Sequence, residues 1–540
     1  MWYHGWKAGR GRGDPGEPVD VRICRPAWKV ATTKTVDDGT FGVLVELIDL
    51  RGRRRLVALP CGALAGDGIA AVRELEAAGI QATHDRLLVH WLRCAPPVKV
   101  ITTMRRTGWT PGFDAFVLPD RTIGDRNAMF APGAAASGAG FASAGDFARW
   151  REAAALAVGN PDIATIVAAA FAAPLIGPLG LPSAGLHVTG PSGRVKTTPL
   201  LIAASAWGRG VETGGYVLLW SATANGVEAI ANERCDAPLI IDEQGARADP
   251  RDVAELVYRL CGGIGRARAR RDGSARPVAA WRTFLLSTAE HALESRLDGP
   301  LPAGVKGRLL ELRYERSLVR DRHGFESDAA FARHVRTIVA EHYGHAGPAF
   351  VAAMLEYGLD WIRRLYTEER KRFGAASPVE ERAANTFALL ALAGELAIRW
   401  AILPWPRGFA RAAAQEVWCA WHATSRAEAD EGRRFVEALR DFIARHGASR
   451  FEELDPDRRS EHDRPIVNRA GWKRRNEAGE VEFLITPDAF KEALAGLPAD
   501  RAPSYLAEVG LLVRPREGYR RLAHRVRIRG ERHVVYVLAG

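Results

Sequence analysis

The sequence predicts an α/β core with a parallel sheet, a β-rich domain before it, and a helical region and a winged-helix-like module after it. Between Gly185 and Leu312, short apolar runs alternate with runs of helical periodicity, the pattern of a parallel sheet with crossover helices. From Ala329 to Ala423 nearly every run has helical spacing. Helices followed by a basic hairpin, as at the C-terminus, are typical of a winged helix.

The chain is long enough for several domains, at about 100–200 residues each. Segments such as Gly42–Leu50 and Arg54–Leu59 are short, apolar and bounded by turn residues, which favours strands in the first part. A linker rich in small residues follows at Ala131–Gly145. The expected units are residues 1–130 (β-rich), 146–345 (α/β core), 346–425 (helical region) and 426–540 (winged-helix-like module).

Composition excludes whole classes of protein. The 540 residues are 47% hydrophobic and 26% charged, as in ordinary globular proteins, so a disordered, collagen-like or disulfide-scaffold chain is excluded. The formal charge is +11, and only nine of the 75 basic residues are lysines. The net charge alone distinguishes poorly between nucleic-acid binding and a solvated surface.

Cysteine usage and hydropathy indicate a cytoplasmic protein without membrane contact. The six cysteines are isolated, and none forms a C-x-x-C pair, which argues against zinc ribbons and thioredoxin-like sites. Met1–Asp20 lacks the apolar stretch of a signal peptide. Ile163–Gly190 is uncharged but interrupted by prolines, so we expect a buried helix and a buried strand rather than a membrane span.

One segment has the order of a phosphate-binding P-loop. The loop Gly190–Thr198 (GPSGRVKTT) follows the apolar run Leu186–Thr189 and precedes a helical run that starts at Pro199, where proline is tolerated. Loop N–H groups and a helix N-terminus bind phosphates, the lysine reaches the β- and γ-phosphates, and the threonine hydroxyl holds Mg²⁺. We therefore expect ATP and Mg²⁺ as cofactors; a Gly/Pro turn between strand and helix is the alternative. The predicted nucleotide-binding residues are Gly190, Gly193, Lys196, Thr197 and Thr198, with Thr197 also a metal ligand.

The motif departs from the P-loop pattern at one position. The pattern G-x-x-x-x-G-K-[ST] has glycine where this chain has Val195. A β-branched residue is poorly suited to a backbone with positive φ. Gly193 supplies some compensating freedom two residues earlier. The departure puts ATP hydrolysis in question.

Two further apolar runs end in polar residues. Ala237–Ile241 ends in Asp242 and Glu243, at the place where P-loop ATPases hold Mg²⁺ through water and polarise the attacking water. A later run ends in Ser287 and Thr288, where a hydroxyl can sense the γ-phosphate. A solvated strand end and a simple cap are the alternatives. We predict Asp242 as a metal ligand and Glu243, Ser287 and Thr288 as catalytic residues.

A glycine-flanked segment between the acidic and sensor runs is strongly basic. Gly262–Arg276 carries five arginines and one aspartate. Such a segment can follow the phosphates of a nucleic acid strand, although a solvated basic loop is the alternative. We expect DNA as the partner, and the predicted DNA-binding residues are Arg266, Arg268, Arg270 and Arg271.

The C-terminal hairpin is a second basic patch. In Arg525–Arg529 the arginines alternate with apolar residues, which places them on one face of a strand. This fits a DNA-contacting wing and equally an ordinary exposed strand. The patch comprises Arg520, Arg521, Arg525, Arg527 and Arg529.

Together these residues resemble a known family, domain-of-unknown-function family nine-twenty-seven, which holds helicase and primase-helicase proteins of plasmids, phages and integrative elements. The resemblance covers most of the chain, and its motifs occur in order. Besides the P-loop and Asp242-Glu243, they include Arg106–Trp109 (RTGW), Val117–Gly124 (VLPDRTIG), Trp220–Glu228 (WSATANGVE), Arg271–Arg276 (RDGSAR), Leu285–Glu290 (LLSTAE) and Asn468–Trp472 (NRAGW).

The resemblance implies an AAA-like P-loop core similar to superfamily three helicases, which act on DNA as homo-oligomeric, usually hexameric, rings. In those proteins the segment between the acidic and sensor strands carries the DNA-contacting hairpin, which here is Gly265–Arg276. An arginine finger from a neighbouring subunit lies beyond the sensor strand, and the candidates here are Arg308 and Arg313.

Two functions of different classes follow from the sequence. The first is an ATP-dependent DNA helicase or translocase of a mobile genetic element, acting in replication. The second is a DNA-binding replication or regulatory protein whose degenerate P-loop hydrolyses ATP weakly or not at all. A primase activity finds no support, because the N-terminal part has neither an acidic metal-binding cluster nor a zinc motif.

Overall fold

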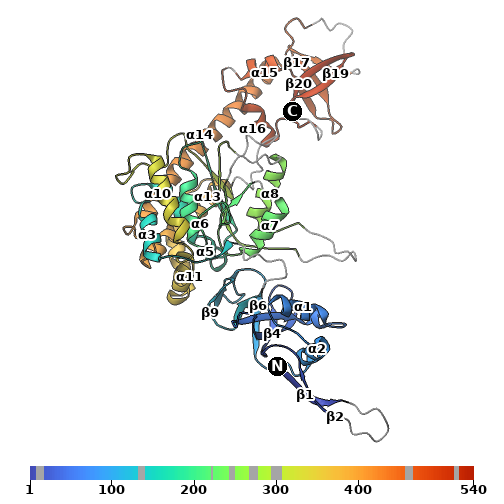
Figure 1. The fold of residues 1–540 in the computed structure, drawn as a ribbon. Helices are drawn as coiled ribbons and strands as arrows, with labels where there is room; N and C mark the ends of the chain where they lie inside the picture. Colours follow the sequence, from blue (N-terminus) through green and yellow to red (C-terminus); the bar gives the residue numbers. More distant parts are fainter. Residues whose placement is uncertain are drawn as a thin grey trace.

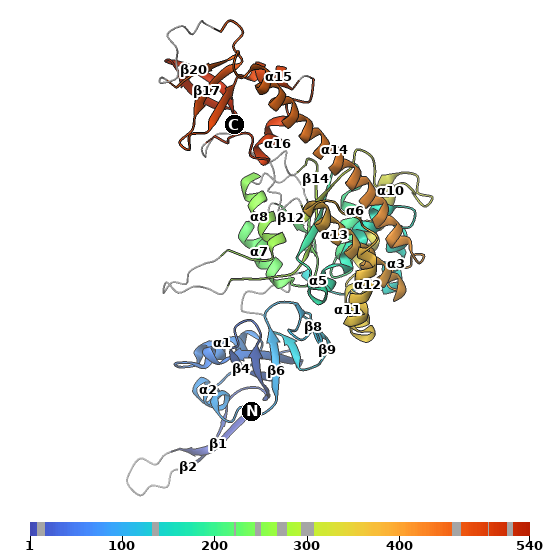
Figure 2. The same ribbon diagram turned by 180° about the vertical axis from the view of Figure 1, so that it is seen from behind.

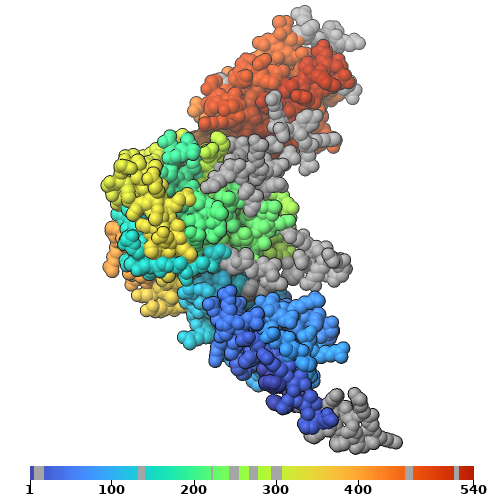
Figure 3. All heavy atoms as spheres, viewed as in Figure 1, coloured from blue at the N-terminus to red at the C-terminus, as the bar shows by residue number. Residues whose placement is uncertain are grey.

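The computed structural model of the chain describes residues 1–7, 17–131, 140–220, 223–242, 250–266, 278–292, 307–455, 466–494, 496–515 and 522–539. The molecule is elongated, and the order of its parts follows the order of the chain (Figures 1 and 3). An N-terminal unit lies at one end, an α/β core with its helices lies in the middle, and a C-terminal unit lies at the other end.

The N-terminal unit is built on a five-stranded mixed sheet in the order β10-β6-β3-β4-β5. The helices α1 and α2 cover one face of this sheet through apolar residues at helical spacing, among them Val72, Leu75, Leu88 and Leu92. A separate hairpin pairs β1 with β2. The elements are β1 Trp2–Lys7, β2 Glu17–Arg22, β3 Ala27–Thr35, β4 Phe41–Ile48, β5 Arg54–Pro60, η1 Cys61–Leu64, α1 Ile69–Ala77, α2 Asp85–Arg93, β6 Val100–Met104 and β10 Ala128–Phe130.

A small antiparallel sheet joins this unit to the core. It consists of β7 Gly108–Trp109, β8 Ala115–Val117 and β9 Thr122–Gly124. Trp109 and Phe116 belong to the large apolar cluster of the core, and the Trp109 indole donates a hydrogen bond to the Pro174 carbonyl at 2.8 Å. The junction is therefore buried and continuous with the core.

The core holds the parallel sheet that the sequence predicts. Its order is β12-β13-β14-β11-β15, and every neighbouring pair is parallel. Numbered from the strand before the P-loop, this order is 5-1-4-3-2 when read from β15. The elements are α3 Phe147–Ala155, α4 Pro161–Ala168, η3 Ala169–Phe171, α5 Ala173–Leu179, β11 Ala184–Thr189, α6 Thr197–Ser205, β12 Leu218–Leu219, α7 Ala224–Glu233, β13 Leu239–Asp242, α8 Pro250–Gly262, β14 Phe284–Ala289 and β15 Leu309–Arg313.

Two apolar layers sandwich the core sheet. On one face, Leu186, Ile240 and Leu286 pack in a cluster with α4, α6 and the helical region. On the other face, Leu239 and Leu285 pack against α7 and α8. Because side chains alternate along a strand, residues two positions apart lie on the same face, which decides where the polar strand ends point.

The helical region packs against the α6 side of the core. Its helices are α10 Asp328–Glu341, α11 Ala346–Tyr357, α12 Leu359–Arg370, α13 Pro378–Arg399 and α14 Phe409–His446. Helix α13 is buried along most of its length, which explains its nearly continuous apolar sequence. Helix α14 has 38 residues and runs from the core into the C-terminal unit, across the expected boundary at 425/426 (Figure 2).

The C-terminal unit contains more strands than the sequence indicates. Its five-stranded sheet has the order β16-β17-β18-β20-β19, with an apolar cluster between the sheet, the end of α14 and two short helices. The predicted terminal hairpin is present as β19–β20, whereas the β17–β18 hairpin was not expected. The winged-helix description stays a prediction. The elements are β16 Phe451–Glu453, β17 Gly471–Arg475, β18 Val481–Ile485, α15 Pro487–Ala493, α16 Ala502–Glu508, β19 His524–Ile528 and β20 Glu531–Ala539.

The uncharged stretch before the P-loop folds as α4, η3, α5 and β11, and its side chains are almost all buried. In the part of the chain that the structure describes, no single helix has the length and apolar character needed to cross a membrane. One bent pair, Pro161–Phe171 with Ala173–Leu179, reaches that length and composition when both helices are taken together.

Candidate nucleotide and nucleic-acid site

The predicted P-loop connects β11, an interior strand of the sheet, to the buried helix α6. Gly190 has φ +150°, and a Cβ there would lie 2.1 Å from the Tyr314 carbonyl oxygen, so only glycine fits. Gly193 has φ +79° and lies in open space. The two predicted glycines therefore serve different needs, a close backbone approach and a left-handed turn.

Val195 adopts the backbone conformation that the P-loop pattern reserves for glycine. Its φ is +60°, in the left-handed region. For a β-branched residue this conformation costs about 1–2 kcal/mol. The half-buried side chain packs against the large apolar cluster, which offsets part of that cost. The loop thus keeps the left-handed turn of a P-loop despite the substitution.

Lys196 folds over the loop. Its Nζ donates hydrogen bonds to the carbonyls of Gly190, at 2.6 Å, and Pro191, at 2.8 Å. Thr197 is the first residue of α6, and Thr198 is buried behind it. The ammonium group, the loop N–H groups and the helix N-terminus together form a place suited to an anion.

Asp242 and Thr288 meet at the same edge of the sheet, where β13 and β14 end. The Thr288 hydroxyl donates a hydrogen bond to the Asp242 carboxylate, and both side chains are buried. Ile240 and Leu286, two residues earlier in each strand, pack on the α6 face, so Asp242 and Thr288 lie on the P-loop side. Glu243 lies outside the described residues.

Ser287 points to the opposite face from Thr288. Its hydroxyl lies 2.7 Å from Nδ1 of His187, in the middle of β11. Both side chains are buried. Of the two predicted sensor residues, the structure therefore brings only Thr288 to Asp242.

An ion pair near Asp242, between a largely shielded carboxylate and a half-exposed guanidinium, was missed by sequence reasoning. Arg336 of α10 donates to both carboxylate oxygens of Glu212, at 2.8 and 2.9 Å. Burial raises the pKa of Glu212, but the hydrogen bonds and charge of Arg336, together with a backbone hydrogen bond, outweigh it and hold that pKa below its ordinary value. The hydrogen bond to Glu212 raises the pKa of Arg336, and the nearby charge of Asp242 adds to this rise. No sequence signal separates Arg336 from the many other arginines.

The two arginine-finger candidates lie at opposite ends of β15: Arg308 directly precedes the strand, and Arg313 is its last residue. The Arg308 carbonyl accepts the Gly185 N–H, at the edge away from the P-loop. Arg313 ends β15 on the P-loop side, where it pairs with Glu311 at 3.0 Å and with Glu428 of α14 at 2.7 Å. It lines a cavity of about 510 Å³ between β15 and α14.

The base of the predicted DNA-binding segment is held together by hydrogen bonds. The Gly265 N–H donates to the Ala279 carbonyl and the Trp281 N–H to the Gly263 carbonyl, both at 2.9 Å. Arg266 pairs with Glu255 of α8 at 2.6 Å. The structure thus shows the two ends of the segment held side by side. Outside the described residues lie Arg268, Arg270 and Arg271.

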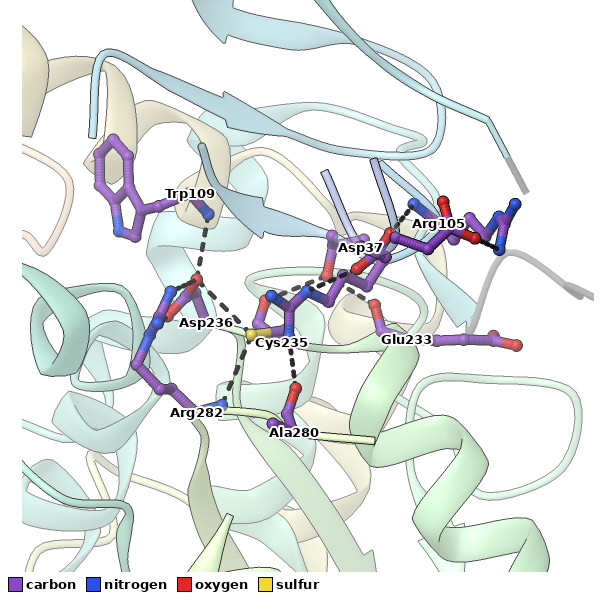
Figure 4. Close-up of polar contacts among 11 residues, drawn as sticks. Asp37, Arg105, Trp109, Glu233, Cys235, Asp236, Ala280 and Arg282 are labelled. Carbon is purple, nitrogen blue, oxygen red and sulfur yellow. Dashed lines mark hydrogen bonds and ion pairs between the residues drawn. The ribbon is translucent and has the colours of Figure 1, made fainter. Parts of the chain in front are cut away.

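The N-terminal unit contacts this base directly. The Arg106 guanidinium donates to the Ala280 carbonyl and lies 3.4 Å from the Asp37 carboxylate. The Thr107 N–H and hydroxyl both donate to the Glu233 carbonyl, at 2.9 and 2.8 Å (Figure 4). The first half of the RTGW motif therefore joins the N-terminal unit to the two segments that lead into β13 and β14.

A buried carboxylate organises the rest of this junction. Asp236 has φ +58° and is fully buried, and Arg282 donates to both of its oxygens at 2.6 and 2.8 Å (Figure 4). The Trp109 N–H donates to the same carboxylate at 3.0 Å. Burial raises the pKa of the neighbouring Cys235 thiol to about 12, which makes it unreactive. Gly108 is required because a Cβ would lie 2.5 Å from Asp236 Oδ2.

The C-terminal basic hairpin shows the predicted alternation in part. Arg525 and Arg527 of β19 are exposed, and Ile528 is buried. Arg529 lies in the turn to β20 and pairs with Glu452 of β16. Arg520 and Arg521 lie outside the described residues.

Comparison with protein families identifies the chain. Residues 2–280, more than half of the chain, match the family described as "Domain of unknown function (DUF927)". The chain belongs to this family. The matched residues of this DUF927 protein include the N-terminal unit, the P-loop, Asp242 and the base of the basic segment.

Among solved structures, the fold is similar to one titled "SCCmec type IV Cch - active helicase", with a TM-score of 0.63 and 16% identity over 97% of this chain and 94% of that chain. A second, "The A form apo structure of NrS-1 C terminal region-CTR", has a TM-score of 0.30 and 8% identity over 94% of this chain and 96% of that chain, too weak a likeness to support a conclusion. No curated protein matches the sequence. The first likeness extends over nearly the whole chain and shows a shared fold.

Proposed function

We propose that this DUF927 protein is an ATP-dependent DNA helicase or translocase of a mobile genetic element, working in replication in the cytoplasm. The observation that carries the proposal is the convergence of the P-loop, Asp242 and Thr288 at one edge of the core sheet. The strand order 5-1-4-3-2 is that of AAA-like ATPase cores. The fold shared with a structure titled as an active helicase adds support.

The residues at this edge suit ATP and Mg²⁺. Lys196 already donates to two loop carbonyls, a geometry that can be redirected to phosphate oxygens. Thr197 and Asp242 would hold Mg²⁺, mainly through the nucleotide's phosphates and water, because no group of three or more metal-binding side chains gathers among the described residues. Glu243 would activate water, and Thr288 would sense the γ-phosphate through Asp242.

The mechanism that we propose couples this edge to DNA through β13 and β14. These strands run from the Asp242–Thr288 pair to the base of the basic segment, so a shift at one end is carried to the other by packed strands. The DNA contacts are assigned to Arg266, Arg268, Arg270 and Arg271. The active form is a homo-oligomeric ring, for example a hexamer, with a winged-helix-like C-terminal unit and with Arg313, on the P-loop side, as the arginine finger.

The test is the DNA-stimulated ATPase activity of the full chain. We expect turnover in the wild type and its loss in Lys196→Ala. The matched control is Lys371→Ala, which removes an exposed lysine paired with Glu368 on α12 and leaves turnover unchanged. Equal turnover in wild type and Lys196→Ala would contradict the proposal.

A DNA-binding protein that does not hydrolyse ATP is the second candidate, and Val195 at φ +60° is the observation that favours it. Glycine at this position removes the cost of the left-handed turn. If the wild type shows no turnover and Val195→Gly does, the second candidate replaces the first.

A further inference from the structure

The sheet of the N-terminal unit has one face covered by α1 and α2 and a second face that is buried around Leu44 but exposed farther along β4. Val43, Val45 and Leu47 of β4 pack under α1 and α2. Glu46 lies between them in the sequence and therefore points to the other face. That face is the one that the two helices leave uncovered.

Two large apolar side chains stand on the exposed part of this second face. Trp28 of β3 pairs with Glu46, and Glu46 pairs with Leu56 of β5, so the three side chains form one row across three strands. Trp28 is 46% exposed and Leu56 is 54% exposed. An indole with this exposure leaves part of its ring accessible to a partner.

The turn beside this row is strongly basic. Arg51, Arg53, Arg54 and Arg55 all lie in or next to the β4–β5 turn and are exposed. The two nearby carboxylates are already engaged: Glu46 with Arg54 at 3.0 Å and Asp49 with Arg55 at 2.9 Å. Asp49 also accepts the backbone N–H groups of Arg51 and Arg53, both at 2.9 Å, which fixes the turn. Among the described residues, no carboxylate pairs with the guanidinium groups of Arg51 and Arg53, which are exposed.

We propose that this surface, Trp28 and Leu56 with Arg51 and Arg53, binds single-stranded nucleic acid. Stacking of bases on an exposed aromatic ring, beside cations that contact the phosphates, is the usual chemistry of single-strand recognition. A duplex keeps its bases stacked on one another and cannot use the indole in this way. The excess of arginine over carboxylate favours a polyanion over a protein partner.

The position of this surface gives it a role distinct from the basic segment. The β3–β4 turn, with Asp37, lies beside Arg106 and the core, and the β4–β5 turn lies at the opposite end of β4. The two contacts would therefore hold one strand at two separated points. The inference rests on the proposed function in that nucleic acid is the substrate.

The experiment measures binding of the full chain to a fluorescein-labelled oligothymidylate, an oligouridylate and a DNA duplex by fluorescence anisotropy. For Trp28→Ala we expect the affinity for the single strands to fall about 5- to 100-fold, the range for loss of one stacked base. Trp28→Phe restores most of it. For Arg51→Ala with Arg53→Ala, the slope of log affinity against log salt falls by about 0.7 for each phosphate that the variant no longer neutralises.

Matched controls keep the result specific. Phe41→Ala removes another exposed aromatic side chain at the other end of β4, and Arg73→Ala with Arg86→Ala removes two exposed arginines from α1 and α2. These variants should bind as the wild type does. An unchanged thermal midpoint shows that Trp28→Ala is folded.

Four outcomes overturn the inference. They are single-strand binding that is unchanged in the Trp28 and arginine variants, an equal loss of duplex binding, a loss equalled by the controls, and a change only in oligomeric state, which would make the surface a contact between copies. In each of these the wild type still binds nucleic acid, so the proposed function stands. If the wild type binds none of the probes, that result contradicts the proposed function itself.

Discussion

The two ends of the parallel strands in the core sheet are held in different ways. We call the end where the strands finish the P-loop edge, and the end where they begin the opposite edge. At the P-loop edge, Lys196 donates hydrogen bonds to two loop carbonyls, and Thr288 donates one to Asp242. At the opposite edge, one buried carboxylate, Asp236, collects Arg282 and the Trp109 N–H into a single network. Lys196 can exchange its carbonyl partners when a ligand arrives, whereas Arg282 cannot leave without depriving the buried Asp236 carboxylate of its ion-pair partner.

Under the proposed function, this difference would separate the end of the sheet that binds nucleotide from the end that is braced against the N-terminal unit. The junction network fixes the start of β13 and β14 against the N-terminal unit, so a movement at the P-loop edge has a firm base to act against. Removing a side chain from the Asp236 network should therefore mainly lower the stability of the fold. Removing one from the P-loop edge should mainly lower activity.

The largest effect on stability is expected for Arg282→Ala. It leaves the fully buried Asp236 carboxylate without its guanidinium partner, which should cost about 3–5 kcal/mol of unfolding free energy. Thermal and urea denaturation measure this. Lys196→Ala, at the other edge, should cost only about 1 kcal/mol while it removes nucleotide binding. Equal losses of stability from the two variants would remove the contrast.

The Glu212–Arg336 pair should give the P-loop side an acid-sensitive contribution. Because the folded-state pKa of Glu212 is below its ordinary value, the pair stabilises the fold above about pH 4.5, and the contribution is lost as the pH falls through the folded pKa. Glu212→Gln should lose about 1.5 kcal/mol at neutral pH. As the pH falls through the folded-state pKa of Glu212, the two proteins should converge in thermal midpoint; a constant difference at all pH values would argue against the pair.

Val195→Gly should change the stability by less than about 1 kcal/mol. Relief of the left-handed conformation gains about 1–2 kcal/mol, and the extra freedom of glycine in the unfolded chain and the reduced packing offset most of this. Val195→Ala keeps the strain and loses the packing, so it should be the less stable of the two. Paired thermal denaturation of both variants tests the order, and the reverse order would show that φ +60° is not strained here.

The smallest effect on stability is expected for Arg106→Ala, within about 1 kcal/mol. Its consequence is local: without the hydrogen bond to the Ala280 carbonyl, hydrogen exchange at the Gly265 and Trp281 amides should become faster. Arg105→Ala is the control, because Arg105 pairs with Asp38 within the N-terminal unit. Equal exchange in both variants would mean that Arg106 does not brace the base of the basic segment.

The parallel sheet and the place of the P-loop could be predicted from sequence, because apolar runs, glycines and a rare lysine carry local signals. The orientation of Ser287 and Thr288 could not, since it depends on which face each strand presents to α6. The Glu212–Arg336 pair and the Asp236 network join residues far apart in the chain, and no local pattern marks such contacts. The strand β17, GWKRR, is short and mostly polar, so a pattern of apolar residues does not find it. The strand β18, VEFLI, is apolar but only five residues long, too short for its periodicity to distinguish strand from helix.

Helix α14 has a mechanical consequence. At about 1.5 Å per residue, its 38 residues span roughly 57 Å. Arg313, at the P-loop edge, holds one point of it through Glu428, and at Gly432 the helix is so close to Tyr505 of α16 that a Cβ would lie 2.1 Å from the ring. The helix is thus a lever arm, and a tilt of a few degrees at the core would carry the C-terminal unit through several ångströms.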